Sequence, residues 1–417
     1  MKILVIGNGA REHALAWKFS RSNRISGLFT APGNAGTAGI GENLQSVDPM
    51  DIDAVTRAAV DHRVDLVFVG PEGPLAAGLV DSLTGAGIAA IGPHAAAAEL
   101  ESSKAVSKRF MDHYSIPTAA HESFSNADAL ERFIRSADRH LVVKKSGLAA
   151  GKGVIESDDV ERLVAAGRAF IDEGDEVVVE DRLLGFEVSV FGISDGRDFM
   201  LLPPCTDYKK AGVGGSGPNT GGMGSLCPVP WLSPAEFDQI RTRIVEPTYA
   251  GLTDAGLAYR GVLYFGIMVT EHGPMLLEYN VRFGDPETQV ALPLLDSDFA
   301  NLCDAAMNDA IGDFPLRISN STALGVVVAA PGYPSDYPTR LPVQHLPSPP
   351  ENEALVFHAA TGLSEDGTVV TGGGRCFTVV GLGAEVLSAR KQAYTHAKDV
   401  VFDGSWFRPD IGGRIFG

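Results

Sequence analysis

The sequence predicts a protein of several domains that combines α/β and α+β architecture. The first hundred residues alternate short apolar runs with helical patterns, the middle is rich in strands joined by glycine turns, and the section beyond Pro331 is rich in strands. Alternating strands and helices are typical of a parallel sheet covered by helices. At 417 residues the chain exceeds the roughly 250 to 300 residues at which one hydrophobic core stops growing.

The N-terminal section is expected to form the parallel sheet. Its strand-like runs are KILVIG, GLFTAP, DLVFVGPE and IAAIGP, and helical patterns begin at Glu12, cover 51–62 and begin again at Pro74. The first turn starts like a dinucleotide-binding fingerprint, but Glu12 stands where the third glycine belongs. The sequence therefore disfavours a nicotinamide site, while free N–H groups at this helix start are suited to a phosphate.

The middle section is expected to be a small α+β module. Residues 104–140 have a helical pattern that is interrupted at 115–117. LVVKKSGLAAGKGVIE then predicts strand, glycine-rich turn and strand, and EVVVEDRLLGFEVSVFGI predicts two strands around a connector. A helical stretch near 234–255 precedes two strands joined by a short turn at 271–274, which predict a hairpin. After Pro331, a proline-rich link leads into the strand-rich C-terminal section.

The composition restricts the classes of partner. Lys plus Arg number 34 against 52 Asp plus Glu, so the net charge is −18, and no global positive field attracts nucleic acid or anionic lipid. No apolar run approaches the roughly 20 residues that span a bilayer, and the N-terminus differs from a signal peptide. The cysteines lack metal-ligand spacing. We expect a cytoplasmic protein that binds neither nucleic acid nor membrane and holds any phosphate by local positive charge.

A cluster of glycines marks a candidate site. The fourteen residues 211–224 include seven glycines, and Asp207, Lys209 and Lys210 stand beside them. Glycine loses more conformational entropy on folding than any other residue, so such a cluster is typical of tight turns or of backbone that approaches a ligand. The alternative is a flexible surface loop, and this stretch alone does not decide between the two.

A second candidate lies in the strand LLEYNVR. Alternation places Glu278, Asn280 and Arg282 on one face. A carboxylate and an amide oxygen are hard ligands that suit Mg²⁺, which fills the rest of its shell with phosphate oxygens and water. An arginine beyond them can meet the same phosphates. The alternative is an exposed face with a surface ion pair, which the following FGDPE makes less favourable.

The third candidate is the glycine-rich turn SGLAAGKG at 146–153. It differs from a Walker A loop because Gly153 follows Lys152 and a strand follows the turn. Such a turn between two strands can fold over a triphosphate as a flap, presenting backbone N–H groups while Lys144 and Lys152 neutralise phosphate charge. The alternative is an ordinary hairpin with solvated lysines.

Five segments, GNGAREHALA, VGPEGPLAAG, SGLAAGKGV, GPNTGGMG and LLEYNVRFGDPETQ, follow one another through the chain. Together they closely resemble the glycinamide ribonucleotide synthetases, or phosphoribosylamine–glycine ligases, which are ATP-grasp enzymes of purine biosynthesis. The resemblance covers essentially the whole chain. It implies an ATP-grasp fold with a Rossmann-like substrate domain at 1–102, an ATP-grasp domain at 103–320 with a lid at about 118–188, and a small β-rich C-terminal domain at 321–417.

The resemblance also implies a reaction in which ATP, glycine and 5-phosphoribosylamine give glycinamide ribonucleotide, ADP and phosphate through glycyl phosphate. It implies Mg²⁺ or Mn²⁺ as cofactor and a monomer. The matched metal ligands are Glu278 and Asn280, and the matched catalytic residues are Arg282, Lys209 and Asp207. The matched nucleotide-binding residues are Lys104, Lys144, Gly147, Gly151, Lys152, Gly153, Glu180, Leu183 and Glu187. The matched substrate-binding residues are Gly9, Glu72, Asn219, Thr220, Gly221, Gly222, Met223, Gly224 and Asp285.

Two departures from the family pattern stand near these sites. The family usually reads KADGLAAGKGV, where this chain has Lys145 and Ser146, so positive charge increases near the expected triphosphate. Tyr208 stands where histidine is common, and we expect little effect from it. Two other functions stay open from the residues: an ATP-grasp ligase or carboxylase for a different acid and amine, and a nicotinamide-binding oxidoreductase or non-catalytic nucleotide sensor.

Overall fold

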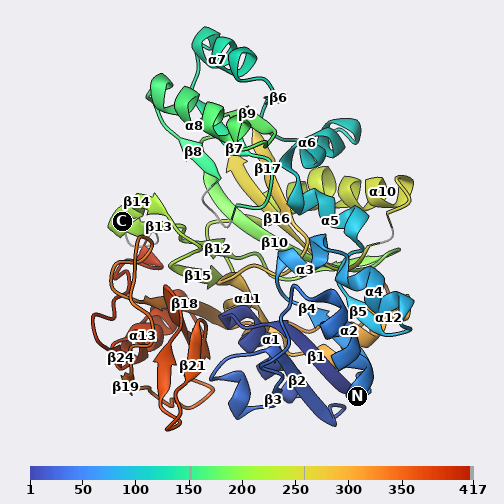
Figure 1. The fold of residues 1–417 in the computed structure, drawn as a ribbon, viewed down its shortest axis with the longest axis vertical. Coiled ribbons are helices and arrows are strands. Elements are labelled where there is room, and N and C mark those ends of the chain that lie inside the picture. Colours follow the sequence, from blue (N-terminus) through green and yellow to red (C-terminus); the bar gives the residue numbers. More distant parts are fainter. Residues whose placement is uncertain (150–152, 258, 414–417) are drawn as a thin grey trace.

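The N-terminal part of the chain forms a parallel sheet, as predicted. The structure is a computed structural model that describes residues 1–149, 153–257 and 259–413. The sheet has the strand order β3-β2-β1-β4-β5, and every adjacent pair is parallel. Its elements are β1 (Lys2–Gly7), α1 (Ala10–Ser20), β2 (Gly27–Pro32), η1 (Thr37–Gly39), β3 (Glu42–Asn43), α2 (Ile52–Asp61), β4 (Leu66–Val69), α3 (Glu72–Ala76), α4 (Leu79–Gly85) and β5 (Ala89–Ile91). It occupies one lower corner of the molecule, drawn in blue (Figure 1).

A small antiparallel sheet stands at the opposite end of the molecule and has the order β6-β9-β7-β8 (Figure 1). Helices α7 and α8 cover one face of it and bury their own apolar core. The elements of this section are α5 (Ala95–Ser102), α6 (Lys104–His113), β6 (His121–Phe124), α7 (Ala127–Ser136), β7 (Leu141–Lys145), β8 (Val154–Glu156), α8 (Val160–Asp172) and β9 (Val177–Asp181).

The helical pattern expected over 104–140, apart from its break at 115–117, is wrong at 121–124. Residues His121–Phe124 form β6, which pairs with β9 from Phe124 opposite Val177 to His121 opposite Glu180. Only Phe124 of this short strand is buried, and it is the single apolar residue of the sequence HESF. The residues themselves therefore give little indication of a strand. The pairing with β9 decides the conformation, which is the usual way in which tertiary context overrides local propensity.

A second antiparallel sheet, β11-β10-β16-β17, forms the floor beneath the small one. The hairpin predicted around 271–274 is confirmed, because β16 and β17 pair up to Thr270 opposite Gly273. The helical stretch predicted near 234–255 is also confirmed and contains a π-helical turn. The elements are β10 (Phe186–Asp195), β11 (Phe199–Leu201), α9 (Pro234–Ile240), η3 (Arg241–Val245), α10 (Glu246–Asp254), β16 (Arg260–Thr270) and β17 (Gly273–Asn280).

A further sheet, named here the C-terminal sheet, has the order β12-β15-β18-β23-β20. Two of its strands, β12 and β15, come from the middle of the chain, and the others come from the strand-rich end that the sequence predicts. Its elements and those around it are β12 (Thr206–Asp207), β13 (Lys210–Gly212), η2 (Val213–Gly215), β14 (Ser216–Asn219), β15 (Gly224–Cys227), α11 (Glu287–Ala291), η4 (Leu292–Leu294), α12 (Phe299–Met307), β18 (Thr322–Ala329), β19 (Val343–His345), β20 (Ala354–His358), β21 (Thr361–Leu363), β22 (Val369–Thr371), β23 (Arg375–Gly383), α13 (Val386–Ala397) and β24 (Val401–Phe402).

Buried aromatic rings join the N-terminal sheet to the segment that follows β17. Phe299 lies with its ring centroid 4.8 Å from that of Phe19 and 5.8 Å from that of Phe68. Phe283 stacks on Phe68 with ring centroids 6.1 Å apart. Such pairs add roughly 0.5 to 1.5 kcal/mol beyond the burial of their area. Across the described residues, no helix combines the length and the apolar character needed to cross a bilayer.

A pair of buried histidines joins the N-terminal sheet to the C-terminal sheet. The backbone N–H of His358 donates to Nδ1 of His13 at 2.9 Å, and the amide of Asn34 donates to the His358 carbonyl at 2.9 Å. Burial, together with the charge of the neighbouring His358, lowers the pKa of His13 to about 3. Burial lowers the pKa of His358 to about 4. Both rings are therefore neutral in the folded chain at neutral pH.

This interface should destabilise the fold in acid. The unfolded histidines bind protons with a pKa near 6.5, so stability is fully present above that pH and is lost as the pH falls toward the folded values. When the pH falls from 7 to 5, the free energy of unfolding should decrease in both proteins. The decrease should be about 1–2 kcal/mol larger in the wild type than in His358→Gln. Urea unfolding at each pH measures this. His272→Gln, at a side chain 80% exposed, should keep the wild-type slope, and a wild-type slope in His358→Gln would contradict the assignment.

Candidate active site

The small sheet β6-β9-β7-β8 is called the upper sheet below, and the sheet β11-β10-β16-β17 is called the floor sheet. A pocket of about 1060 Å³ lies between these two sheets and continues to the base of the glycine-rich segment. Its walls come from β7 and β9 above, β17 below, α6 on one side and the glycine-rich residues on the other. It gathers most of the site residues that the sequence predicts. Those that line it are Glu72, Lys104, Lys144, Gly153, Glu180, Leu183, Glu187, Asp207, Lys209, Asn219, Thr220, Gly221, Glu278, Asn280, Arg282 and Asp285.

The structure does not bring every predicted residue to this pocket. Met223 is fully buried in the apolar core of the C-terminal sheet, and Gly224 pairs with Val326 inside that sheet. Both positions of the GPNTGGMG motif therefore serve packing: a Cβ on Gly224 would lie 2.6 Å from a backbone oxygen. Gly9, Gly147 and Gly222 also lie outside the pocket lining. Gly151 and Lys152 fall outside the described residues.

Glu278 is the electrostatic centre of the pocket. Burial by itself would raise the pKa of this carboxyl, but the surrounding cations lower it overall. These cations are Lys209, Lys144, Lys104 and Arg282. Burial lowers the pKa of Lys104, and Glu278 is the largest influence that opposes this. One ionised carboxylate thus offsets the mutual repulsion of cations that come from four different parts of the chain.

The donor set around Glu278 suits a divalent cation that arrives with phosphate. Asn280 presents its side-chain oxygen on the same strand and accepts a hydrogen bond from Arg282 at 3.3 Å. Among the described residues, no group of three or more His, Cys, Asp or Glu side chains is arranged to hold a metal ion. Mg²⁺ is commonly bound by one or two protein oxygens, with phosphate oxygens and water completing its shell. Glu278 and Asn280 fit that pattern.

A β-bulge shapes the strand that carries these ligands. The register between β16 and β17 shifts after Gly266 opposite Glu278, so that Ile267 faces Leu276. The extra residue, Leu277, consequently lines the pocket beside Glu278. Bulges re-aim side chains and are common next to active sites. The alternation of side chains expected along this strand correctly places Glu278, Asn280 and Arg282 on the pocket side. It does not predict that Leu277 also lines the pocket.

Two predicted residues, Glu180 and Lys144, form a buried triad with Lys108, which the sequence analysis missed. Glu180 binds Lys108 at 2.7 Å with one carboxylate oxygen and Lys144 with the other. Burial would raise the pKa of Glu180, but Lys144 and Lys108 lower it overall. Lys108 follows Lys104 by one helical turn, so both lysines are expected on one face of the helix. This spacing is the feature of the sequence that could have identified Lys108. The triad has a net positive charge and holds Lys144 against the pocket wall.

Arg282 is held by two carboxylates. Its guanidinium binds Glu101 at 2.7 Å and Glu72 at 3.3 Å, and Glu101 also accepts from the backbone N–H of Val281 at 2.7 Å. Burial opposes the charged form of Arg282, but Glu101 and Glu72 raise its pKa overall. The sequence analysis missed Glu101, because an acid at the end of a short alanine-rich helix carries no distinctive pattern. These contacts fix the direction in which Arg282 enters the pocket.

The side of the pocket next to the glycine-rich residues contains a second group of charges, which includes Glu187, a residue expected to bind the nucleotide. Lys209 binds Glu187 at 2.5 Å, and although burial would lower the pKa of Lys209, Glu187 raises it well above its ordinary value. Burial and the nearby Glu287 raise the pKa of Asp207 well above its ordinary range. Oδ1 of Asp207 is buried without a hydrogen-bond partner among the described residues. The side chain of Asp207 lines this side of the pocket beside Lys209.

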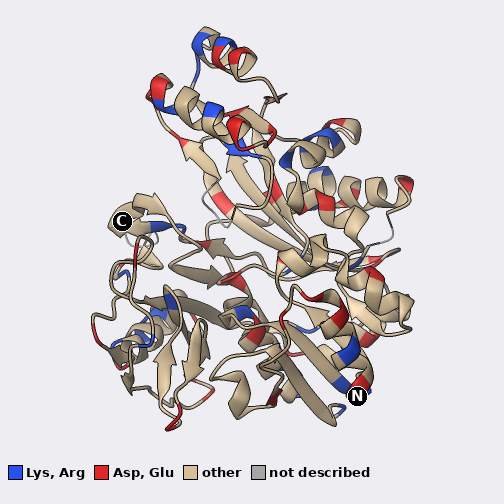
Figure 2. Cartoon of the chain, in the orientation of Figure 1, with Lys and Arg blue, Asp and Glu red and all other residues tan. Residues whose placement is uncertain are grey.

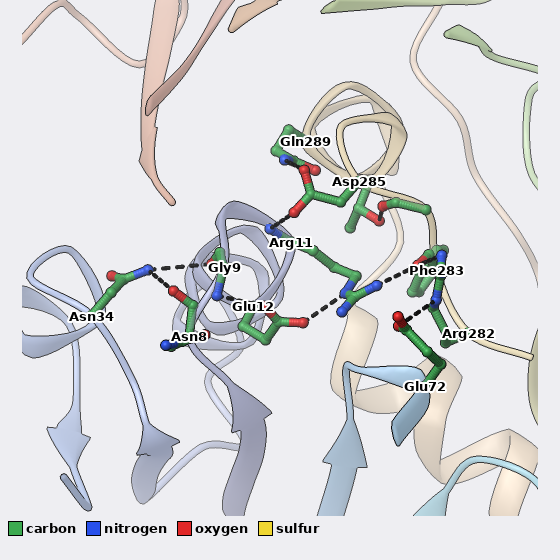
Figure 3. A network of polar contacts seen from close by, with 12 residues as sticks. Asn8, Gly9, Arg11, Glu12, Asn34, Glu72, Arg282, Phe283, Asp285 and Gln289 are labelled. Carbon is green, nitrogen blue, oxygen red and sulfur yellow. Dashed lines mark hydrogen bonds and ion pairs between the residues drawn. The ribbon is translucent and has the colours of Figure 1, made fainter. Parts of the chain in front are cut away.

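The start of α1 differs from the open phosphate cradle that the sequence suggested. The N–H of Gly9 donates to Glu12 at 2.6 Å, and the N–H of Arg11 points to Asp285 at 3.4 Å. Figure 3 shows how Arg11 then reaches across to the carbonyl of Phe283, at 3.0 Å. Carboxylates of the chain accept from these two N–H groups, so the N–H groups of Gly9 and Arg11 are not free as the sequence suggested. Through the N–H of Arg11, this turn contacts the carboxylate of Asp285.

The two departures in the flap strand have separate structural explanations. Lys145 points away from the pocket and binds Glu173 and Asp175, each at 2.8 Å. Ser146 is buried, and its hydroxyl accepts from the N–H of Ala105 at 3.1 Å at the start of α6. Lys145 thus belongs to a surface ion-pair group, and Figure 2 shows acidic and basic positions interspersed on α7 and α8 at this end of the molecule. Its charge is compensated within the upper sheet.

Known proteins are similar to this chain over nearly its whole length. Models of the phosphoribosylglycinamide synthetase N domain, ATP-grasp (A) domain and C domain match residues 1–101, 102–288 and 323–414. A phosphoribosylamine–glycine ligase of Agrobacterium fabrum is 43% identical over 99% of this chain and 98% of that protein. The crystal structure of a phosphoribosylamine–glycine ligase from Thermotoga maritima has a TM-score of 0.86 and 33% identity, covering 99% of this chain and all of that chain.

A longer relative matches the same residues. The trifunctional purine biosynthetic protein adenosine-3 of Gallus gallus is 44% identical over 99% of this chain. The match spans 42% of the length of that protein. The similarity of this chain is therefore to one part of the longer relative.

The lysines at adjacent positions of β7 should behave differently. Lys144→Ala should weaken Mg-ATP binding at least tenfold, because it removes a pocket cation and leaves Glu180 with one partner. Lys145→Ala should change the affinity less than twofold, because its ammonium group binds Glu173 and Asp175. Titration calorimetry on variants whose circular dichroism matches the wild type measures both. Equal losses in the two variants would contradict the assignment of strand faces.

Proposed function

Because the chain belongs to the phosphoribosylglycinamide synthetase family, we propose that it joins glycine to 5-phosphoribosylamine in a reaction driven by ATP, giving glycinamide ribonucleotide, ADP and phosphate. The observation that carries the proposal is the pocket in which Lys104, Lys144, Lys209 and Arg282 surround Glu278. This family membership disfavours the oxidoreductase and sensor hypotheses. Identity to ligases of this name along the whole chain favours glycine over another acid.

The nucleotide occupies the half of the pocket between the two antiparallel sheets. Lys104 and Lys144 neutralise its phosphates, and the connector with Leu183 lies against the adenine. Glu278 and Asn280 would hold the divalent cation, Mg²⁺ or Mn²⁺, which neutralises charge on the phosphate oxygens when bound. Glu180 of β9 and Gly153, which precedes β8, complete this half. Positioning and charge neutralisation are the main contributions of a protein to phosphoryl transfer.

The reaction has two steps. A glycine carboxylate oxygen attacks the γ-phosphorus and ADP leaves, which gives glycyl phosphate; the amine of phosphoribosylamine then attacks the carbonyl carbon and phosphate leaves. Arg282, fixed by Glu101 and Glu72, stabilises the negative charge that develops in both steps. The nitrogen loses a proton as the amide forms. The departing phosphate takes up that proton, and Asp207 lines this part of the pocket beside Lys209.

The acceptor substrates occupy the half of the pocket lined by the glycine-rich segment. Asn219, Thr220 and Gly221 present polar groups there, beside Lys209 and Asp285. A small anionic substrate can approach such backbone closely because glycine lacks a side chain. The proposal includes a cytoplasmic monomer, and the net charge of −18 supports the absence of a nucleic-acid partner.

Glycine-dependent turnover tests the proposal. We expect ADP release from Mg-ATP and freshly generated phosphoribosylamine to require glycine, with a product whose mass matches glycinamide ribonucleotide. Omitting glycine should reduce ADP release to the background of ATP hydrolysis. A folded protein that binds ATP and forms a product with a different acid, or no product at all, would contradict the assigned substrates.

A further inference from the structure

The segment that lines the acceptor half of the pocket, residues 208–222, is here called the acceptor segment. It leaves the C-terminal sheet at the end of β12 and returns to it at β15, and β15 pairs with β18 along its whole length. In between, β13 and β14 form a hairpin of their own, with Lys210 opposite Asn219. The hairpin contacts fix the shape of the segment, but its placement against the pocket depends on other contacts.

Residues of the C-terminal domain hold one end of the acceptor segment. Arg375 of β23 donates to the carbonyl of Gly221 and, at 3.4 Å, to that of Gly222. The hydroxyl of Tyr333 accepts from the N–H of Gly221 at 3.1 Å. Both backbone groups of Gly221 are therefore bound by side chains from the last hundred residues of the chain.

The same arginine ties this end to the loop that follows the metal-ligand strand. Arg375 also donates to the carbonyl of Asp285 at 2.9 Å and lies 3.4 Å from its carboxylate. Burial opposes the charged form of Arg375, but Asp285 raises its pKa overall. A planar guanidinium with several donors can fix such an arrangement, which a lysine cannot. Arg375 thus joins three chain segments at the edge of the pocket.

The other end of the acceptor segment is held by the C-terminal tail. Arg408, which is 3% exposed, donates to the carbonyl of Lys210 at 2.7 Å. Asp410 accepts from the N–H of Gly214 at 2.8 Å, and the hydroxyl of Tyr208 accepts from the N–H of Gly412 at 3.0 Å. Tyr208, the departure from the family histidine, therefore receives a contact from the tail.

We infer that the C-terminal domain is part of the acceptor site, and that Arg375 is a positioning residue that places the acceptor segment and Asp285 for the substrates other than ATP. Arg375 touches backbone carbonyls rather than the reacting atoms, so it acts through Gly221 and Asp285. Lys209 and Asp207 stand at the base of the same segment, and their placement follows from it. The kinetic consequence rests on the proposed function, whereas the structural consequence does not.

Hydrogen exchange tests the structural consequence. In Arg375→Gln, the amides of residues 219–223 should exchange at least tenfold faster than in the wild type, while those of β7 and β9 keep their rates. Tyr333→Phe removes only the hydroxyl and should accelerate the Gly221 amide severalfold, which provides a second variant if the first folds poorly. Arg260→Gln is the matched control, because Arg260 also binds carbonyls, those of Ala306 and Met307, far from the segment. Wild-type exchange in both test variants would overturn the inference.

Steady-state kinetics tests the functional consequence on the same variants. Arg375→Gln should raise the KM for glycine or phosphoribosylamine, or lower kcat, by at least tenfold while the Kd for ADP stays within twofold. An equal loss of ADP affinity would show a general disturbance of the pocket and would overturn the positioning role. If the wild type itself showed no glycine-dependent turnover, the proposed function would fail, while the exchange result would still decide the structural inference.

Discussion

The site depends on the balance between buried carboxylates and the cations that they hold. A chain with a net charge of −18 must create positive potential locally in order to bind a triphosphate. Glu278 lies among cations from α6, β7, the acceptor segment and the end of its own strand, and Glu180 lies between Lys108 and Lys144. Without these carboxylates, the cations would repel one another in a buried setting. With these carboxylates, the cations can lie close together before a substrate binds. The negative phosphates of the ligand then neutralise the remaining positive charge.

Four sheets of the fold each supply one part of the site. The upper sheet contributes Lys144 and Glu180, the floor sheet contributes Glu278 and Asn280, and the N-terminal sheet contributes Glu72 through the start of α3. The C-terminal sheet sends out the acceptor segment from its own strands. Contacts between these parts of the chain, such as the His13 and His358 pair, hold them together.

Local patterns in the sequence predicted the parallel sheet, the β16–β17 hairpin and the polar face with Glu278, because alternation and turn residues act over a few positions. The residues that hold the site together were not predictable in this way. Glu101, Lys108, Arg375 and Arg408 meet their partners only after distant segments pack. Met223 was predicted to bind substrate because it belongs to the glycine-rich motif. Its side chain is instead buried in the apolar core of the C-terminal sheet. Strand β6 was missed because pairing with β9, rather than its own composition, makes it a strand.

The central claim is that Glu278 is both the common counterion of the pocket cations and the main metal ligand. Titration calorimetry of ADP binding with and without Mg²⁺, on the wild type and Glu278→Gln, tests it most directly. The account predicts that Mg²⁺ strengthens ADP binding to the wild type at least tenfold and loses most of this effect in the variant. It also predicts that metal-free ADP binds the variant more tightly, because the uncompensated cations attract its phosphates. Weaker metal-free binding to the variant, or an undiminished effect of Mg²⁺, would contradict the claim.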